Sequence, residues 1–163
     1  ADYKKILAAG DALGLNVNPN KCELFLIEPQ STECAEALEK FCELTEGVRL
    51  IQKQDLTLLG APILPEAIEG VLNPKLESLK LMASRLEEID KHDALFLLRQ
   101  CFSIPKMTYF FRTGPCFMKP DILKLYDEAI KEALTDILNL NTITESIWNQ
   151  CTLPVKDGGL GIR

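Results

Sequence analysis

Gly14-Leu15-Asn16-Val17-Asn18-Pro19-Asn20-Lys21-Cys22-Glu23-Leu24 is the stretch that decides how the first part of this chain folds. Apolar residues recur at helical spacing before it, and Gly14 is a typical residue just beyond a helix end. Asn18-Pro19-Asn20 favours a turn, because proline presets φ and asparagine tolerates the position that follows. The apolar run from Cys22 to Ile27 then predicts a strand covered on both faces. Lys21 stands at the root of that strand.

Downstream of this strand the pattern predicts one helix and two further strands. Ser31 or Thr32 is suited to begin a helix whose glutamates face solvent. Residues 48–52 and 56–59 then read as short strands, and we expect them to pair as a hairpin around Lys53-Gln54-Asp55. The expected result is a small α/β piece with short antiparallel strands.

After Pro62 the pattern is helical. Pro65 suits a first helical position, and Asn73-Pro74 predicts a cap followed by a new helix. Further helices are expected to begin near Asp90, Pro105, Pro120 and the capping-box pattern Thr142-x-x-Glu145. The expected fold class is α+β, mostly α, with an α/β piece over residues 1–64 and a helical bundle over residues 65–163.

Composition is that of a globular protein, with 47% hydrophobic and 26% charged residues. The net charge of −6 argues against nucleic-acid binding by the whole surface. This net charge is distributed unevenly along the chain: residues 28–46 are strongly acidic, whereas residues 99–126 are basic. No apolar run is long enough for a membrane span, and the cysteines show no C-x-x-C pair. We therefore expect reduced thiols, an intracellular (cytoplasmic or nuclear) protein and no membrane partner.

The basic segment carries the best nucleic-acid signal in the sequence. Its basic residues are Arg99, Lys106, Arg112 and Lys119. They alternate with the aromatic residues Phe102, Tyr109, Phe110, Phe111 and Phe117. Cations would follow phosphates and rings would stack on bases or sugars, although rings at this spacing are more often core residues.

Candidate catalytic groups are sparse. No Asp-Asp pair occurs, and Asp11 lies nine positions after Asp2, which puts the two on opposite sides of a shared helix. Cys101 likewise lies nine positions after His92, the single histidine. Gly158-Gly159-Leu160-Gly161 favours a flexible turn over a phosphate loop, because no helix follows it. We expect no metal site and no catalytic residue in this chain.

Together with the opening stretch, two further motifs resemble a known family in their order along the chain. They are Leu58-Leu59-Gly60-Ala61-Pro62-Ile63 and Leu153-Pro154-Val155-Lys156-Asp157-Gly158-Gly159-Leu160-Gly161-Ile162-Arg163. The set resembles the C-terminal palm and thumb of reverse transcriptases of non-LTR (LINE-like) retrotransposons. By that resemblance, residues 1–64 correspond to the end of the palm and residues 65–163 to the thumb and its tail.

The resemblance implies roles for individual residues. Lys21 would lie near the incoming triphosphate, and Leu59 with Gly60 would form the hairpin that grips the primer. Arg112 would face the minor groove of the template–primer duplex. The metal-binding aspartates of the family lie upstream of the matching segment, so Mg2+ is implied only for the full-length enzyme and no cofactor for this chain.

The expected function is therefore that of a fragment of an RNA-directed DNA polymerase, which holds an RNA/DNA duplex but is inactive alone. The chain begins at Ala1 instead of methionine and stops after Gly161-Ile162-Arg163, so we expect a fragment of a longer protein or a processed or engineered one. The alternative comes from the acidic charge: a retrotransposon-derived helical protein co-opted for structural or interaction roles, with a protein partner or self-association in place of nucleic acid.

Overall fold

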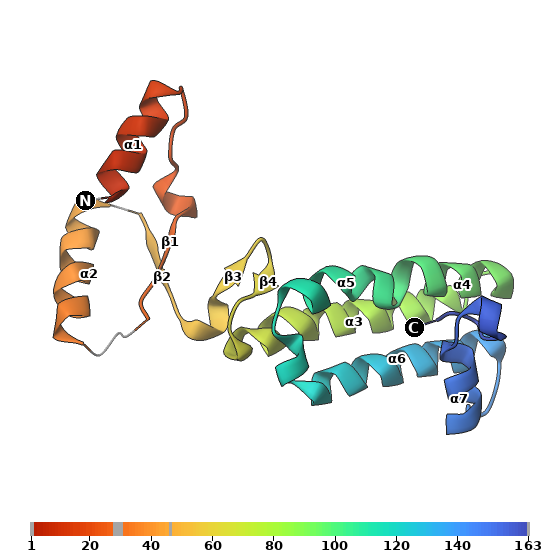
Figure 1. Ribbon diagram of the computed structural model, residues 1–163. Helices are drawn as coiled ribbons and strands as arrows, with labels where there is room; N and C mark the ends of the chain where they lie inside the picture. Colours follow the sequence, from red (N-terminus) through yellow and green to blue (C-terminus); the bar gives the residue numbers. More distant parts are fainter. Residues whose placement is uncertain (1, 28–30, 46, 163) are drawn as a thin grey trace. The chain divides into compact units, whose positions relative to one another are not determined.

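A computed structural model describes residues 2–27, 31–45 and 47–162. It divides into two compact units, Ala1–Lys53 and Gln54–Arg163. Helices dominate and the strands are short, which confirms the expected α+β, mostly α, fold class (Figure 1).

The first unit is a β-α-β arrangement preceded by a helix. Helix α1 (Asp2–Ala12) ends before Gly14, which has a φ of 72°, and the 3-10 turn η1 (Pro19–Lys21) leads into strand β1 (Glu23–Phe25). Helix α2 (Thr32–Leu44) follows, capped by Ser31, whose Oγ accepts a hydrogen bond from the Cys34 amide at 3.1 Å. Strand β2 (Arg49–Ile51) then pairs in parallel with β1, with Leu24 opposite Leu50.

This pairing corrects the hairpin expected between residues 48–52 and 56–59. Parallel strands need a long crossover, which α2 supplies, and a helical turn, η2 (Lys53–Asp55), carries the chain away from β2. The strand around Leu24 is also not covered on both faces. Among the described residues of this unit only Thr45 and Ile51 are buried, because two strands and two helices enclose little volume.

The second unit begins with a small hairpin. Strand β3 (Thr57–Leu58) pairs antiparallel with β4 (Ala61–Pro62), so that Leu58 lies opposite Ala61. β4 packs on helices α5 and α3, so the hairpin belongs with the helices. The division therefore falls at Lys53/Gln54, earlier than the boundary expected at 64/65, because Ala61 and Pro62 are buried in the helical unit.

Helix α3 (Ile68–Leu86) follows the 3-10 turn η3 (Pro65–Ala67) and continues through Pro74. The sequence predicted that a new helix would start at Asn73-Pro74, and this is wrong. Proline inside a helix costs about 3 kcal/mol. Here Leu72 and Leu76 are buried on either side of it in one core, and their burial offsets that cost.

The other helices form a bundle around α3. Asp90 caps α4 (Lys91–Leu97) by accepting a hydrogen bond from the His92 amide at 2.9 Å. The π-helical stretch η4 (Leu98–Phe102) leads to α5 (Ile104–Thr113). After the turn η5 (Cys116–Met118) come α6 (Pro120–Leu138), α7 (Glu145–Thr152) and the turn η6 (Val155–Asp157). Thr144, not Thr142, caps α7, because its Oγ1 accepts from the Ile147 amide at 3.4 Å.

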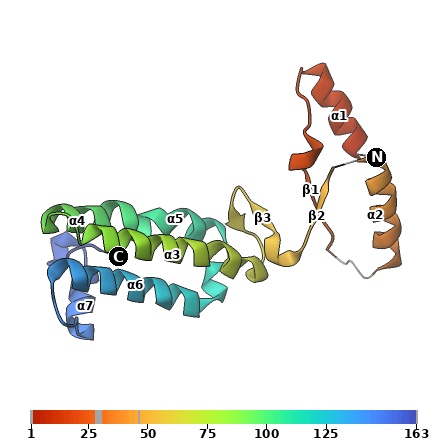
Figure 2. The same cartoon turned by 180° about the vertical axis from the view of Figure 1, so that it is seen from behind.

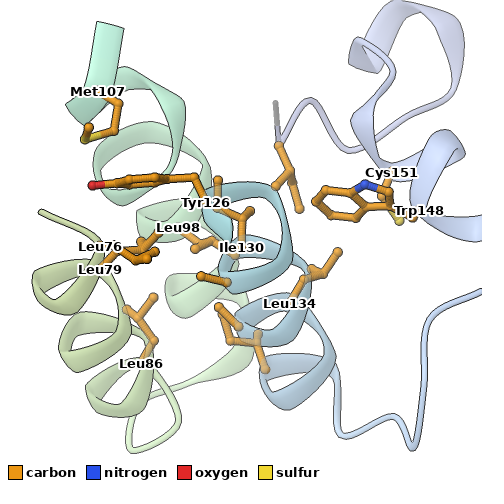
Figure 3. Packing of buried hydrophobic residues seen from close by; sticks show 14 of the residues in the cluster. Leu76, Leu79, Leu86, Leu98, Met107, Tyr126, Ile130, Leu134, Trp148 and Cys151 are labelled. Atoms are coloured by element: carbon orange, nitrogen blue, oxygen red, sulfur yellow. The ribbon is translucent and has the colours of Figure 1, made fainter. Parts of the chain in front are cut away.

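The core of the second unit lies between α3 and α6, which run alongside each other in Figure 1 and in Figure 2. Leu72, Leu98 and Leu134 are fully buried there. Figure 3 shows Leu76, Leu79 and Leu98 gathered beside Ile130 of α6, with Trp148 and Cys151 of α7 on another side of the same helix.

The C-terminal tail is packed, which corrects the flexible turn expected for its glycines. Ile162 is only 1% exposed and belongs to the bundle core. The tail folds back on α7: the Leu160 amide donates to Cys151 O at 3.1 Å and the Gly161 amide to Leu153 O at 2.8 Å. A Cβ at Gly159 would lie 2.0 Å from Leu153 O, so only glycine allows this close approach.

Candidate nucleic-acid interface

The tip of the β3–β4 hairpin is formed by Leu59 and Gly60. Their φ angles are 51° and 81°, the two positive values that a two-residue type I′ turn requires. Glycine adopts this conformation freely, but leucine does so at a cost of about 1 kcal/mol. The Leu59 side chain is 88% exposed, so the turn presents an apolar tip to solvent without packing it.

Helix α5 holds this hairpin from the side. The Tyr109 hydroxyl donates a hydrogen bond to Leu59 O at 3.0 Å. At the end of the same helix, Gly114 packs on Pro62 of β4, where an added Cβ would lie 2.9 Å from the proline Cγ. The hairpin is therefore fixed to α5 at its tip and at its base.

Arg112 is the predicted contact residue that this arrangement brings to the hairpin. It lies in the last turn of α5, between Tyr109 and Gly114, and its side chain is exposed. Phe110 lies on a different face of α5, where its ring is under the Lys75 ammonium of α3, 5.2 Å from the ring centroid. Arg112, three positions after Tyr109, is therefore the cation on the side of α5 that supports the hairpin tip.

The other basic residues expected to bind nucleic acid are engaged within the fold. The guanidinium of Arg99 lies against the backbone of Gly161, whose Cβ would be 3.3 Å from Nε. Lys106 Nζ is 3.3 Å from Ser78 Oγ and 3.2 Å from the Met82 sulfur.

Lys119 is paired with an acidic residue. Its Nζ is 2.7 Å from Glu69 Oε1, and the hydrogen bond and charge of Glu69 raise the pKa of Lys119. This pair links η5 to the start of α3. Lys119 and Arg99 are thus placed to hold elements of the bundle together, whereas Arg112 is turned to solvent.

Lys21 belongs to the first unit, at the end of η1, and its side chain is exposed. Asp11 is exposed on α1 and Asp55 is exposed in η2. Over residues 2–27, 31–45 and 47–162, no group of three or more His, Cys, Asp or Glu side chains is placed to hold a metal ion. Of the helices in those ranges, none has both the length and the apolar character needed to cross a bilayer.

The sequence did not reveal which residues fix the hairpin to α5. Tyr109 was one of several aromatic residues at core-like spacing, and no role was predicted for Gly114. Their partners, Leu59 and Pro62, lie about fifty residues away in the chain. No local pattern encodes a contact over that separation, so only the folded chain identifies it.

Comparisons with protein-family models, with curated proteins and with solved structures give no match.

Proposed function

We propose that this chain is the palm-end and thumb part of a LINE-like RNA-directed DNA polymerase and that it holds the primer–template duplex. The observation that carries the proposal is the attachment of the Leu59–Gly60 tip to α5 through Tyr109. A hairpin tip and a basic helix end that move as one body are suited to fix the position of a nucleic-acid backbone.

In this proposal each group has a limited task. Arg112 attracts phosphates by charge, and displacement of counterions makes the binding sensitive to salt. The exposed turn at Leu59 and Gly60 approaches the strand end closely, because the glycine carries no side chain. Lys21 would contact the triphosphate only in the complete enzyme. The Mg2+ carboxylates would be supplied outside this chain, so the chain alone joins no nucleotides.

The test is a duplex titration with a fluorescent RNA/DNA hybrid at about 50 mM salt, repeated at about 200 mM. We expect binding that weakens steeply with salt. Arg112→Glu should weaken it about tenfold or more, since it removes one phosphate contact and adds a repulsive charge. Arg85→Glu, the same charge change at an exposed residue near the end of α3, is the matched control.

Two outcomes would contradict the proposal. One is the absence of binding at the lower salt concentration. The other is an equal loss of affinity for Arg112→Glu and Arg85→Glu, which would show that only overall charge matters and that the hairpin side of α5 is not the binding face.

A second candidate function is protein interaction or self-association, and the first unit favours it. Parallel sheets are normally covered on both faces. Here Leu50 of β2 is exposed, as are Leu13, Leu15 and Ile27. Light scattering of the purified chain would test this candidate. A stable dimer that Leu50→Lys dissociates supports it, and a strict monomer at high concentration rejects self-association.

A further inference from the structure

A pocket lies at the end of the bundle where α3 and α6 both finish, and its volume is about 300 Å³. The polar residues that line it are Glu87, Lys91, Asp136 and Asn139. We infer that it binds a free aliphatic α-amino acid in its zwitterionic form. The inference is independent of the proposed duplex binding.

Two long helices bring negative charge to this pocket. α3 and α6 have 19 residues each and run side by side in the same direction (Figure 1). Leu86 and Glu87 line the pocket from the end of α3, and Asp136, Ile137 and Asn139 line it from the end of α6. The C-terminal end of a helix carries a partial negative charge. The two helix ends and the two carboxylates therefore attract the positively charged group of a ligand.

The charged side chains of the pocket are not committed to partners in the fold. Within the part of the chain that the structure describes, none of Glu87, Lys91 and Asp136 takes part in an ion pair. Lys91 thus lines the same pocket as two carboxylates and pairs with neither of them. The pocket offers separate positions for an ammonium and for a carboxylate.

A zwitterion matches both positions. Its ammonium has three N–H donors, for which the carboxylates of Glu87 and Asp136 and the side-chain carbonyl of Asn139 are acceptors. Its carboxylate accepts from the Lys91 ammonium. An α-amino acid carries both charges on one carbon atom, and the pocket volume is at the small end of the range for small-molecule sites. A ligand with a single charge would leave one of the two positions unused.

A metal ion suits this pocket less well. Over the described ranges, no group of three or more His, Cys, Asp or Glu side chains is placed to hold an ion. The pocket therefore offers two carboxylates, whereas calcium takes six to eight oxygen ligands.

The apolar part of the pocket selects an aliphatic side chain. Leu86, Ala94 and Ile137 are 4%, 1% and 2% exposed, and Ile89 is half-exposed beside them. Their contact with a ligand side chain would remove apolar surface of the ligand from water. Leucine should therefore bind more tightly than glycine, which has the same two charges and no side chain.

The experiment is an NMR titration of the full chain with L-leucine, compared with two ligands that each lack one charge. Leucinamide keeps the ammonium without the carboxylate, and 4-methylpentanoate keeps the carboxylate without the ammonium. We expect saturable shifts for leucine at the amides of residues 86–91 and 136–139. Each comparison ligand should bind about fivefold to tenfold more weakly, because it loses charge-assisted hydrogen bonds.

Two substitutions test the two positions separately. Asp136→Asn should weaken the binding of leucine and leucinamide about threefold to tenfold and should not weaken that of 4-methylpentanoate. Lys91→Met should weaken the binding of leucine and 4-methylpentanoate by a similar factor and should not weaken that of leucinamide. A loss of folding would lower the binding of all three ligands together, so this crossed pattern reports on the pocket itself.

Glu88→Gln is the matched control, because Glu88 is exposed next to Glu87 and is not among the described residues that line the pocket. It should change the affinity for leucine less than twofold. The inference would be overturned by the absence of saturable shifts with leucine, or by equal affinity for leucine, glycine and the two single-charge ligands. Equal effects of Glu88→Gln and Asp136→Asn would overturn it as well.

Discussion

Gly114 lies directly against Pro62: a Cβ on the glycine would be 2.9 Å from the proline Cγ and 3.1 Å from its carbonyl oxygen. This contact joins the end of α5 to β4. Because the neighbour is a proline ring and a backbone carbonyl, neither can move aside without displacing the strand. The position of the hairpin base against α5 therefore depends on the absence of a side chain at residue 114.

Gly114→Ala should destabilise the second unit by about 1–3 kcal/mol, the usual cost of overpacking. Urea unfolding followed by the fluorescence of Trp148, the single tryptophan, measures it. Gly70→Ala is the control: its Cβ would meet only Gln54 O at 3.8 Å, and Gly70 lies inside α3. That change should stabilise the unit by about 0.5–1 kcal/mol. Equal effects of the two substitutions would contradict the close contact.

Tyr109→Phe should loosen the hairpin tip, because it removes the hydrogen bond to Leu59 O. The loss should be about 0.5–1.5 kcal/mol, the net value of a typical hydrogen bond. The Ile63 amide donates a hydrogen bond to Leu56 O across the hairpin. Faster hydrogen exchange of this amide would measure the loosening of the hairpin. Thr108→Val removes a hydroxyl of α5 that bonds only within the helix, to Ile104 O. It should leave that exchange rate unchanged, and a change in it would mean that helix stability, not the tyrosine bond, was being measured.

Ile162→Ala should cost about 2–4 kcal/mol, because the side chain is 1% exposed and its removal leaves a cavity. Val155→Ala, at an exposed residue of the same tail, should change the free energy of unfolding by less than about 0.5 kcal/mol. Thermal unfolding of both variants measures the difference. A neutral Ile162→Ala would mean that the tail does not contribute to the core.

Stability should fall at alkaline pH because of two neutral acids inside the bundle. Burial raises the pKa of the Cys116 thiol, and burial together with the nearby Cys116 raises the pKa of Tyr126. In the unfolded chain these groups ionise near their ordinary values, about 8.5 and 10. Between those values and the higher folded ones, the unfolded state binds fewer protons, so the free energy of unfolding decreases as pH rises.

Urea unfolding followed by circular dichroism from pH 7 to 11 would test this dependence. Tyr126→Phe should make the decline above about pH 10 shallower, because one of the two groups is gone. At neutral pH the free energy of unfolding of the same variant should be about 1 kcal/mol lower, because the hydrogen bond to Leu72 O is missing. An unchanged slope above pH 10 would rule out a contribution from Tyr126.

Local signals in the sequence determined much of this protein. Ser31 and Asp90 cap the helices they were expected to cap, Pro120 begins α6, and Gly14 follows the end of α1. These features depend on residues within a few positions of one another, through capping hydrogen bonds and fixed φ angles. The mostly helical α+β class follows from them.

The tertiary structure alone decided which segments pair and which basic side chains contact other parts of the fold. Strand β2 pairs with β1 in parallel instead of continuing into a hairpin, and α3 passes through Pro74 because a shared core lies on both sides of it. Lys119 and Arg99 look equivalent to Arg112 in the sequence, yet Lys119 pairs with Glu69 and Arg99 lies against Gly161, whereas Arg112 is exposed. Such outcomes depend on burial and on contacts between residues far apart in the chain, and no local pattern of residue types carries that information.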